Sequence, residues 1–380
     1  MEPIEAALKG LGDYCRTSGF CGWDVFDGLN SSLLQSTPLY RSSLVRLAWI
    51  QFFKRSPVNL RAVARVPKGC NAKGLALFAS GLLVQRSLEE ARALLERLES
   101  VCCTGYEGWS WGYDFDWESR AFYVKKGTPN LVTTVFVANS FLDYFDVTGD
   151  RRYLGVADDA CKFILHHLVL EEDDSFLCFR YIPGEAAVVH NAYMLGAALL
   201  GRVFRHTRTP RYLEASTKAM RRGVKALRPD GSWFYGERGH HQFVDNFHTG
   251  FNLVALNQWM LSTGDRTWEK EVRNAYRYWM DTFFLSDGRP KYYNDSLYPI
   301  DIHCSAQGIV TCLKLQEFDP RSLDLAARIA RWAIENMQDR RGYFYYQRTR
   351  WYTNKVPYMR WSQAWMFYAL SLLIAQRAGK

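Results

Sequence analysis

One pattern occurs five times between Trp109 and the C-terminus of this 380-residue chain. Each copy is a turn rich in glycine and aromatic residues, then a long polar loop, then an apolar segment with few charges. Successive apolar segments begin 55 to 61 residues apart, near Asn130, Asn191, Asn246, Ile302 and Trp361. A period of this size is typical of arrays in which each repeat is one supersecondary unit.

Charge distinguishes two kinds of helix within each repeat. Residues 190–204 carry one formal charge, Arg202, whereas residues 211–228 are rich in Lys, Arg and Glu. A helix that is apolar all round is buried, and a helix with a charged back lies at the surface. The same contrast recurs in the later repeats, so the sequence predicts inner helices that alternate with outer ones.

The N-terminal third of the chain extends the array. We expect helices at residues 4–16, 39–53, 73–84 and 88–102, which brings the total to about six hairpins plus one extra helix. Six hairpins can close into a ring. The sequence therefore predicts an all-α (α/α)6 toroid, or six-hairpin barrel, formed by residues 1–380 as a single domain. The long aromatic-rich loops all fall on one face and are expected to form a cleft.

Composition favours a sugar ligand in that cleft. Aromatic residues make up 15% of the chain and are concentrated in the long loops. Flat rings stack on the apolar faces of sugars, although most single rings in a protein belong to its core. The net charge of +9 suits an acidic saccharide. No nucleic-acid-binding motif accompanies the charge, so we expect no nucleic-acid partner.

Cysteines and hydropathy bear on the compartment. The nine cysteines are scattered and odd in number, which favours a reduced, cytoplasmic protein. The start, Met-Glu-Pro-Ile-Glu, does not resemble a signal peptide. No apolar run is long enough for a membrane span. The spacing of Cys, His and Asp specifies no metal site, and we expect no cofactor.

Two helix starts carry the strongest candidates for chemistry. Asp245 and His248 stand at one, and Asp301 and His303 stand at the next, with each Asp expected to cap its helix. Such an imidazole suits a base or a donor to substrate. Tyr293 is a further candidate base. Candidate substrate-binding residues on the loop face are Trp111, Asp114, Asp116, Asn191, Tyr193, Trp233, Tyr235, Glu237, Arg360 and Trp361.

Arg360 is expected at the mouth of a ring of helix N-termini, where it would attract an anion such as a uronate carboxylate. A salt bridge from Arg360 to Asp301 or Asp245 is the equally plausible structural alternative.

Four segments together resemble a known superfamily. They are residues 22–31 (GWDVFDGLNS), 245–252 (DNFHTGFN), 298–303 (YPIDIH) and 360–365 (RWSQAW). This combination resembles a little-characterised group of prokaryotic proteins, associated with polysaccharide biosynthesis, in the six-hairpin glycosidase-like superfamily. The resemblance covers nearly the whole chain and implies a carbohydrate-active toroid, but it supplies no catalytic residues. The spacing near His248 is also similar to that in the helical domain of glucuronyl C5-epimerases.

Three functions fit these observations. The first is hydrolysis of an oligo- or polysaccharide, in which Asp245 or Asp301 works with a second carboxylate across the glycosidic bond. The second is abstraction of the C5 proton of a uronate by His248 or Tyr293, as in a lyase or epimerase, with Arg360 or Asn191 neutralising the carboxylate. The third is a non-catalytic glycan-binding or scaffold protein in polysaccharide biosynthesis.

Overall fold

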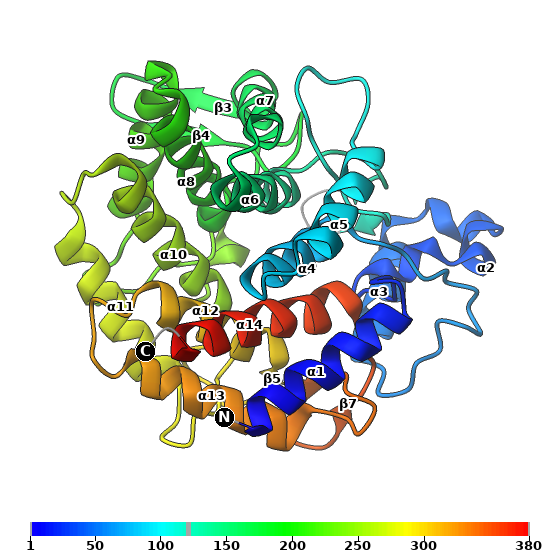
Figure 1. Ribbon diagram of the computed structural model, residues 1–380. Helices are drawn as coiled ribbons and strands as arrows, with labels where there is room; N and C mark the ends of the chain where they lie inside the picture. The colour runs from blue at the N-terminus through cyan, green and yellow to red at the C-terminus, as the bar shows by residue number, and fades with distance from the viewer. Residues whose placement is uncertain (1, 119–122, 379–380) are drawn as a thin grey trace.

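The computed structural model describes residues 2–118 and 123–378 of the chain. In these ranges, six inner helices form a closed ring and six outer helices pack around them (Figure 1). The inner helices are α4 (Ala72–Val84), α6 (Leu131–Thr148), α8 (His190–Thr207), α10 (Asn246–Thr263), α12 (Ile302–Lys314) and α14 (Trp365–Ala378). The outer helices are α5 (Leu88–Ser100), α7 (Arg151–His167), α9 (Pro210–Lys225), α11 (Glu269–Phe283), α13 (Ser322–Met337) and α1 (Glu2–Thr17). The predicted (α/α)6 toroid is confirmed.

Burial explains the contrast in charge between the two rings. In α8 every residue from His190 to Gly201 is buried, because its neighbours in the inner ring and its outer partner cover it on all sides. In α9 only one stripe is buried, including Tyr212, Ala215 and Ala219, and the charged side chains face outwards. Apolar side chains gain most from burial on all sides, so the uncharged helices form the inner ring.

The two ends of the described chain complete the ring. Helix α1, blue in Figure 1, is the outer partner of the red C-terminal helix α14, which in turn packs between α12 and α4. The Gln338 Nε2 amide joins α1 to the turn after α13, because it donates to both Ala7 O and Gly342 O. The sixth hairpin is thus built from segments more than 300 residues apart.

Every inner helix begins at the same end of the ring, where the long loops lie. Side-chain caps mark several of these starts: Asn71, Asn130, Asp245 and Asp301 each accept a hydrogen bond from a backbone N–H of the first turn. Both capping aspartates were predicted. The loops contain short strands, namely β1 (Trp117–Glu118), β2 (Tyr123–Val124), β3 (Val169–Glu172), β4 (Leu177–Phe179), β5 (Ile300–Asp301), β6 (Gln347–Arg348) and β7 (Thr353–Asn354).

Residues 18–71, between α1 and α4, form a lobe at the side of the ring in Figure 1. The lobe contains η1 (Asp27–Asn30), α2 (Ser32–Gln35), η2 (Pro38–Arg41) and α3 (Ser43–Arg55). Helix α3 is the extra helix that the sequence predicts. None of the helices in the described ranges is long and apolar enough to cross a membrane.

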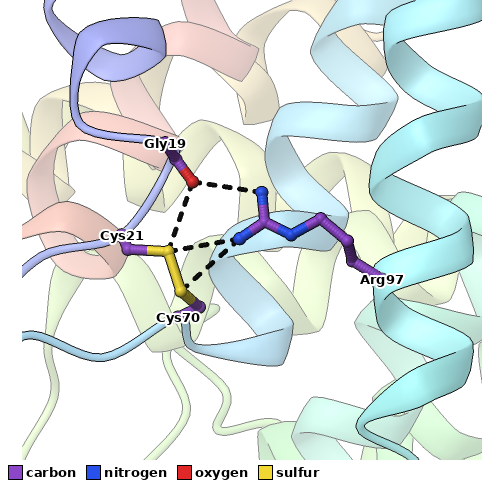
Figure 2. The surroundings of a disulfide bond; sticks show 4 residues. All are labelled: Gly19, Cys21, Cys70 and Arg97. Carbon is purple, nitrogen blue, oxygen red and sulfur yellow. Dashed lines mark hydrogen bonds between the residues drawn. A yellow bond between two sulfur atoms is a disulfide. The ribbon is translucent and has the colours of Figure 1, made fainter.

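A disulfide joins the two ends of this lobe. Cys21 and Cys70 are bonded to each other, and the Arg97 guanidinium donates to both sulfurs (Figure 2). The backbones of Gly22 and Gly69 also pair in both directions, at 2.8 and 3.0 Å. The expectation that all cysteines are reduced therefore fails at this pair, whose members are 49 residues apart and carry no spacing signal.

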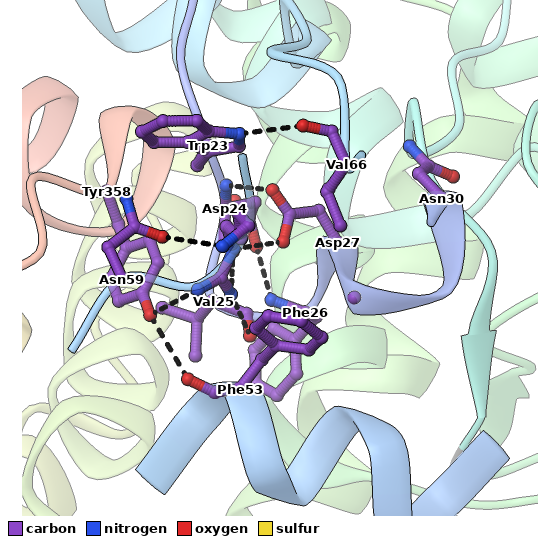
Figure 3. Close-up of polar contacts among 12 residues, drawn as sticks. Trp23, Asp24, Val25, Phe26, Asp27, Asn30, Phe53, Asn59, Val66 and Tyr358 are labelled. Atoms are coloured by element: carbon purple, nitrogen blue, oxygen red, sulfur yellow. Dashed lines mark hydrogen bonds and ion pairs between the residues drawn. The ribbon is translucent and has the colours of Figure 1, made fainter. Parts of the chain in front are cut away.

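Two buried arginines hold the lobe against the ring. Arg61 donates to Asp27 at 2.6 Å and to Tyr358 at 2.9 Å, and Arg360 donates to both carboxylate oxygens of Asp24 at 2.7 Å. Figure 3 shows the loop of Asp24 and Asp27, in which Asp24 N donates to the Asp27 carboxylate. These pairs place the aromatic-acidic loop 22–31 over the loop face of the toroid.

Candidate active site

A cavity of about 170 Å³ lies at the loop face, among the N-terminal ends of the inner helices. The lobe, the long loops and the first turns of five inner-ring segments contribute to its wall. The wall consists of Phe26, Lys54, Lys73, Tyr113, Phe115, Trp117, Val132, Tyr181, Asn191, Tyr235, Phe247, His248, Phe251, Tyr292, His303, Arg360 and Trp361. Among the described residues, this wall contains two imidazoles and three cationic side chains but no carboxylate.

His248 is held in one orientation by the aspartate that caps its helix. The Asp245 carboxylate accepts from His248 N at 2.9 Å and lies 2.6 Å from His248 Nδ1. Asp245 is fully buried, whereas the His248 side chain keeps 22% of its surface exposed. A carboxylate at Nδ1 fixes a proton there, so Nε2 is the atom left for chemistry in the cavity.

His303 occupies the equivalent place on the next inner helix, α12. Its Nδ1 lies 3.2 Å from the backbone oxygen of Trp361, which can only accept, so Nδ1 carries the proton. Its Nε2 is buried and has no hydrogen-bond partner in the part of the chain that the structure describes. Burial, with the nearby Lys73 as the next cause, holds the pKa of His303 well below its usual range. His303 is therefore a neutral imidazole with a free lone pair.

Asp301 does not face the cavity. Its carboxylate accepts from His303 N at 2.9 Å, from Trp361 Nε1 at 2.9 Å and from Gln347 Nε2 at 3.2 Å. Burial raises the pKa of Asp301 to about 6, although these hydrogen bonds lower it. Asp301 thus fixes the positions of His303 and Trp361, and all of its described contacts are donors that favour the carboxylate.

The three cations differ in how far they are neutralised. Arg360 forms a bidentate ion pair with Asp24, so the predicted salt bridge exists but its partner is not Asp301 or Asp245. Lys73, in the first turn of α4, has no carboxylate partner within ion-pair distance among the described residues, and its Nζ lies 4.1 Å from the centre of the Phe136 ring. Lys54 on α3 lies over Phe26 at 5.3 Å. Burial lowers the pKa of both lysines.

One further polar atom in the wall lacks a partner. Asn191 is buried at the start of α8, and its Oδ1 makes no hydrogen bond to any described residue. Buried polar atoms are almost always paired, so the free Asn191 Oδ1 and His303 Nε2 indicate positions that a ligand or water would satisfy. Tyr, Phe and Trp side chains of the loops supply flat apolar walls around these atoms.

A second cavity, of about 320 Å³, lies towards the other end of the ring. It is lined near the helix C-termini by Asp143, Asp146, Arg202 and Lys314. Phe251 borders both cavities and separates them inside the ring. Arg202 is paired with both Asp143 and Asp146 at 2.7 Å, so this part of the second cavity presents an ion-pair cluster.

Six of the candidates proposed from the sequence line the loop-face cavity. They are Asn191, Tyr235, His248, His303, Arg360 and Trp361. Asp245 and Asp301 lie directly behind the two histidines. Tyr293 lies outside the wall, with its ring edge against Phe243.

The other candidates are engaged elsewhere. Trp111, Tyr193 and Trp233 are buried in the core, where each finds a hydrogen-bond partner in its own surroundings. Asp114 accepts from Asn71 at 2.7 Å, and Asp116 accepts from Tyr40 and from Lys126 N. Glu237 is exposed and pairs with Arg222. A position in the long loops of the repeat therefore did not bring these side chains to the cavity.

Sequence reasoning missed two lysines and several rings of the wall. Lys73 had a signal, because it is the sole charge in residues 72–84, a segment that is otherwise apolar. No feature of the sequence indicated Lys54, since its place depends on how α3 folds over the ring. Phe26, Tyr113, Phe115, Trp117, Tyr181, Phe247 and Tyr292 lie in or beside the segments that were singled out, but nothing in the sequence separates them from core aromatics. Among the described residues, no group of three or more Cys, His, Asp and Glu is placed to hold a metal ion.

The fold and the cavity define a six-hairpin toroid with its site at the loop face. Its solved neighbours have the same fold, as the resemblance to the six-hairpin glycosidase-like superfamily implied. The chain is similar to cellobiose 2-epimerase from Bacillus thermoamylovorans, with a TM-score of 0.62 and 14% identity over 80% of this chain and 86% of that one.

Two hydrolases have a comparable likeness. An unsaturated glucuronyl hydrolase specific for heparin gives a TM-score of 0.59 and 11% identity, over 81% of this chain and 85% of that chain. A GH76 alpha-mannanase from Bacteroides thetaiotaomicron gives a TM-score of 0.59 and 13% identity, over 81% of this chain and 87% of that chain. No protein-family model and no curated protein sequence matches the chain. At these identities the likeness shows the fold.

Proposed function

We propose that this protein is a carbohydrate-active enzyme that moves a carbon-bound proton of a sugar, as an epimerase or lyase does. The observation that carries the proposal is the composition of the cavity wall, in which two imidazoles face the same space and no described carboxylate does. The histidines lie close enough for His248 to lower the pKa of His303. Two such groups can serve as the base and the acid of a proton transfer.

The two histidines suit different roles. His303 is neutral, with its Nε2 unpaired, and accepts a proton from a carbon next to a carbonyl or carboxylate group. His248 has the buried Asp245 carboxylate at Nδ1, which orients the ring, and it returns a proton from Nε2. Return to the other face of the carbon gives epimerisation, and loss of a β-substituent instead gives elimination.

The cations favour proton transfer over hydrolysis. Removing a proton from carbon puts negative charge on the neighbouring oxygen, and Lys73, Lys54 and Arg360 favour that charge. Glycoside hydrolysis passes through an oxocarbenium-like state, which cations disfavour and which needs two carboxyl groups at the scissile bond. Asp245 and Asp301 are behind the histidines and fully engaged by donors. The wall therefore supports proton transfer over hydrolysis.

Saccharide is the substrate class that the aromatic wall and the similar folds support. Several of the solved neighbours are named as enzymes of sugars, among them epimerases and hydrolases. The excess of unpaired cations favours a sugar with a carboxylate or another acidic group, as the net charge of the chain also does.

Isotope incorporation tests the proposal. The protein is incubated with reducing disaccharides and with uronic-acid oligosaccharides in D2O, and the products are analysed by NMR and mass spectrometry. Proton transfer predicts deuterium at one sugar carbon. His248→Asn and His303→Asn are expected to lower the exchange rate by at least about 100-fold, whereas the matched control His166→Asn, at an exposed histidine on α7, leaves it unchanged.

The same incubation in H2¹⁸O tests hydrolysis as the second candidate. The pKa of Asp301, raised to about 6, is the observation that favours it, because a raised pKa suits a general acid. Incorporation of ¹⁸O at a new reducing end, without carbon-bound deuterium and with activity lost in Asp301→Asn, would replace the proposal by hydrolysis. Saccharide binding without either isotope would indicate a binding protein.

A further inference from the structure

Two stretches of this chain contain no acidic residue, and both reach the same surface. Residues 28–88 and 340–380 include no Asp or Glu, although the whole chain has 39 of them. Residues 28–70 form most of the lobe, and residues 347–354 form the hairpin of β6 and β7. Tyr352 OH donates to Arg55 O at 2.6 Å and Asn354 Nδ2 donates to Ser56 O at 2.8 Å, so the hairpin packs directly on the end of α3.

Large apolar side chains are exposed on this lobe and hairpin. Helix α3 turns Leu44, Ala48 and Phe52 outwards, at a spacing of four residues that puts them in one stripe. At the tip of the hairpin, Trp351 is 83% exposed. The exposed large apolar residues of this region are Leu33, Leu39, Leu44, Phe52, Val58, Val63, Trp351 and Tyr352. Elsewhere in the described ranges such residues are scattered singly, as is normal for a protein surface.

Basic side chains are interleaved with the apolar ones. The exposed cations are Arg41, Arg55, Arg65, Lys68, Arg348, Arg350 and Lys355. Within residues 2–118 and 123–378, none of them has a carboxylate partner within ion-pair distance. The Arg350 guanidinium lies 5.3 Å from the centre of the Trp351 ring. Some basic residues of the outer helices are paired with a carboxylate, as Arg211 is with Glu172. The charge on the lobe is therefore left for an external anion.

We propose that this lobe-and-hairpin surface docks on a membrane surface that contains anionic lipids. Amphipathic elements with Leu, Phe and Trp beside Lys and Arg lie at the boundary of headgroups and acyl chains, and anionic lipids add attraction for each basic residue. A second copy of this chain fits poorly, because two surfaces of the same positive charge would face each other. The protein docks as a peripheral protein.

The surface borders the candidate active site. On α3, Phe52 faces outwards while Lys54 lines the cavity, only two residues away. A protein docked by this face presents its cavity close to the headgroup layer. The docking inference does not depend on the proposed reaction, since binding to vesicles is measured without substrate.

Vesicle co-sedimentation of the full chain tests this inference. The wild type is expected to bind vesicles of phosphatidylcholine with about a quarter phosphatidylglycerol, and to bind pure phosphatidylcholine at least tenfold more weakly. Leu44→Glu with Phe52→Glu is expected to reduce binding at least tenfold. A second variant, Arg348→Gln with Arg350→Gln, changes only polar exposed residues and should weaken binding and its salt dependence.

The matched control puts glutamates on exposed apolar residues of the opposite face. Val147→Glu with Leu261→Glu changes side chains that are 57% and 53% exposed near the ends of α6 and α10. This variant should bind vesicles like the wild type. Equal binding to neutral and anionic vesicles, no binding to either, or an equal loss in the control would overturn the inference. So would a concentration-dependent dimer that the α3 variant abolishes.

Discussion

Lys73 has the least ordinary environment of any charged residue in the cavity. It stands in the first turn of an apolar inner helix, with its ammonium over the Phe136 ring and within 5.2 Å of the centres of the Phe251 and Trp365 rings. Burial without a paired carboxylate lowers its pKa, and the charge of Arg360 lowers it further. A residue kept in this state at a cost to stability fits a functional role better than a structural one.

The loss of stability from burying the Lys73 ammonium predicts that Lys73→Met is more stable than the wild type by an amount that depends on pH. The unfolded chain keeps the ordinary pKa of 10.5 and so binds more protons than the folded chain above the lowered folded-state pKa. The stability lost by burying charged Lys73 is greatest below the pKa of Lys73 in the folded chain, and the loss disappears as the pH rises towards 10.5. Urea unfolding should find Lys73→Met more stable by about 1–3 kcal/mol near neutral pH, with a smaller gap at alkaline pH.

The exposed Lys270 on α11 provides the control. Lys270→Met should leave the free energy of unfolding within about 0.5 kcal/mol of the wild type at every pH. A Lys73→Met protein that is less stable than the wild type at neutral pH would contradict this account of Lys73.

Asp245 has two contacts that a substitution can separate. Asparagine is as good a helix cap as aspartate, so Asp245→Asn should keep the bond to His248 N and melt within a few degrees of the wild type. The amide removes the negative charge from His248 Nδ1 and disturbs its tautomer. Deuterium incorporation into a substrate sugar should fall by about 10²–10⁴-fold. An unchanged exchange rate would show that His248 does not act through Asp245.

At the scale of elements, the inner and outer helices could be predicted because the distribution of charged residues within each helix indicates how much of its surface is buried. Residues 190–204 carry a single formal charge, Arg202, because most of the segment is enclosed, and that information is local. The predicted caps at Asp245 and Asp301 are local as well. The fold of the lobe depends instead on contacts across more than 300 residues, such as Asp24 with Arg360, so no short window of sequence contains it.

The lobe also depends on a disulfide bond that the spacing of the cysteines in the sequence did not indicate. Opening the Cys21–Cys70 disulfide frees a loop of 49 residues, and chain entropy alone predicts a loss of about 2–4 kcal/mol in the free energy of unfolding. Cys70→Ser, or a reductant with the wild type, should both produce that loss in urea unfolding. Cys103→Ser, at a free thiol, should not. If the reductant leaves the free energy of unfolding of the wild type unchanged, the disulfide does not stabilise the lobe.

At the scale of the whole molecule, closure of the ring is the feature with the largest consequences. The toroid could be predicted from its period, since six two-helix units fill a circle. The sequence did not indicate that α1 pairs with α14, because α1 shares no repeat pattern with the later outer helices. The candidate site was predicted where Asp and His recur at helix starts, and it was missed where the wall comes from α3, α4 and the lobe.

Gly342 is where that closure is tightest. Its φ of +94° disfavours any side chain, and an added Cβ would fall on the backbone of Gly10 in α1. Gly342→Ala should therefore lower the free energy of unfolding by about 3 kcal/mol or more. Gly149→Ala, with a φ of +74° but open space around it, should cost only about 1 kcal/mol. Equal costs, measured by urea unfolding, would mean that the closure of the ring leaves room at Gly342.

A crystal structure with a bound uronic-acid oligosaccharide tests the central claim most directly. The account predicts that the reacting sugar carbon lies between His248 and His303, about 3–3.5 Å from each Nε2, with its acidic group towards Lys73 or Lys54. A glycosidic oxygen held between two carboxylates, with both histidines remote from the sugar, would contradict it.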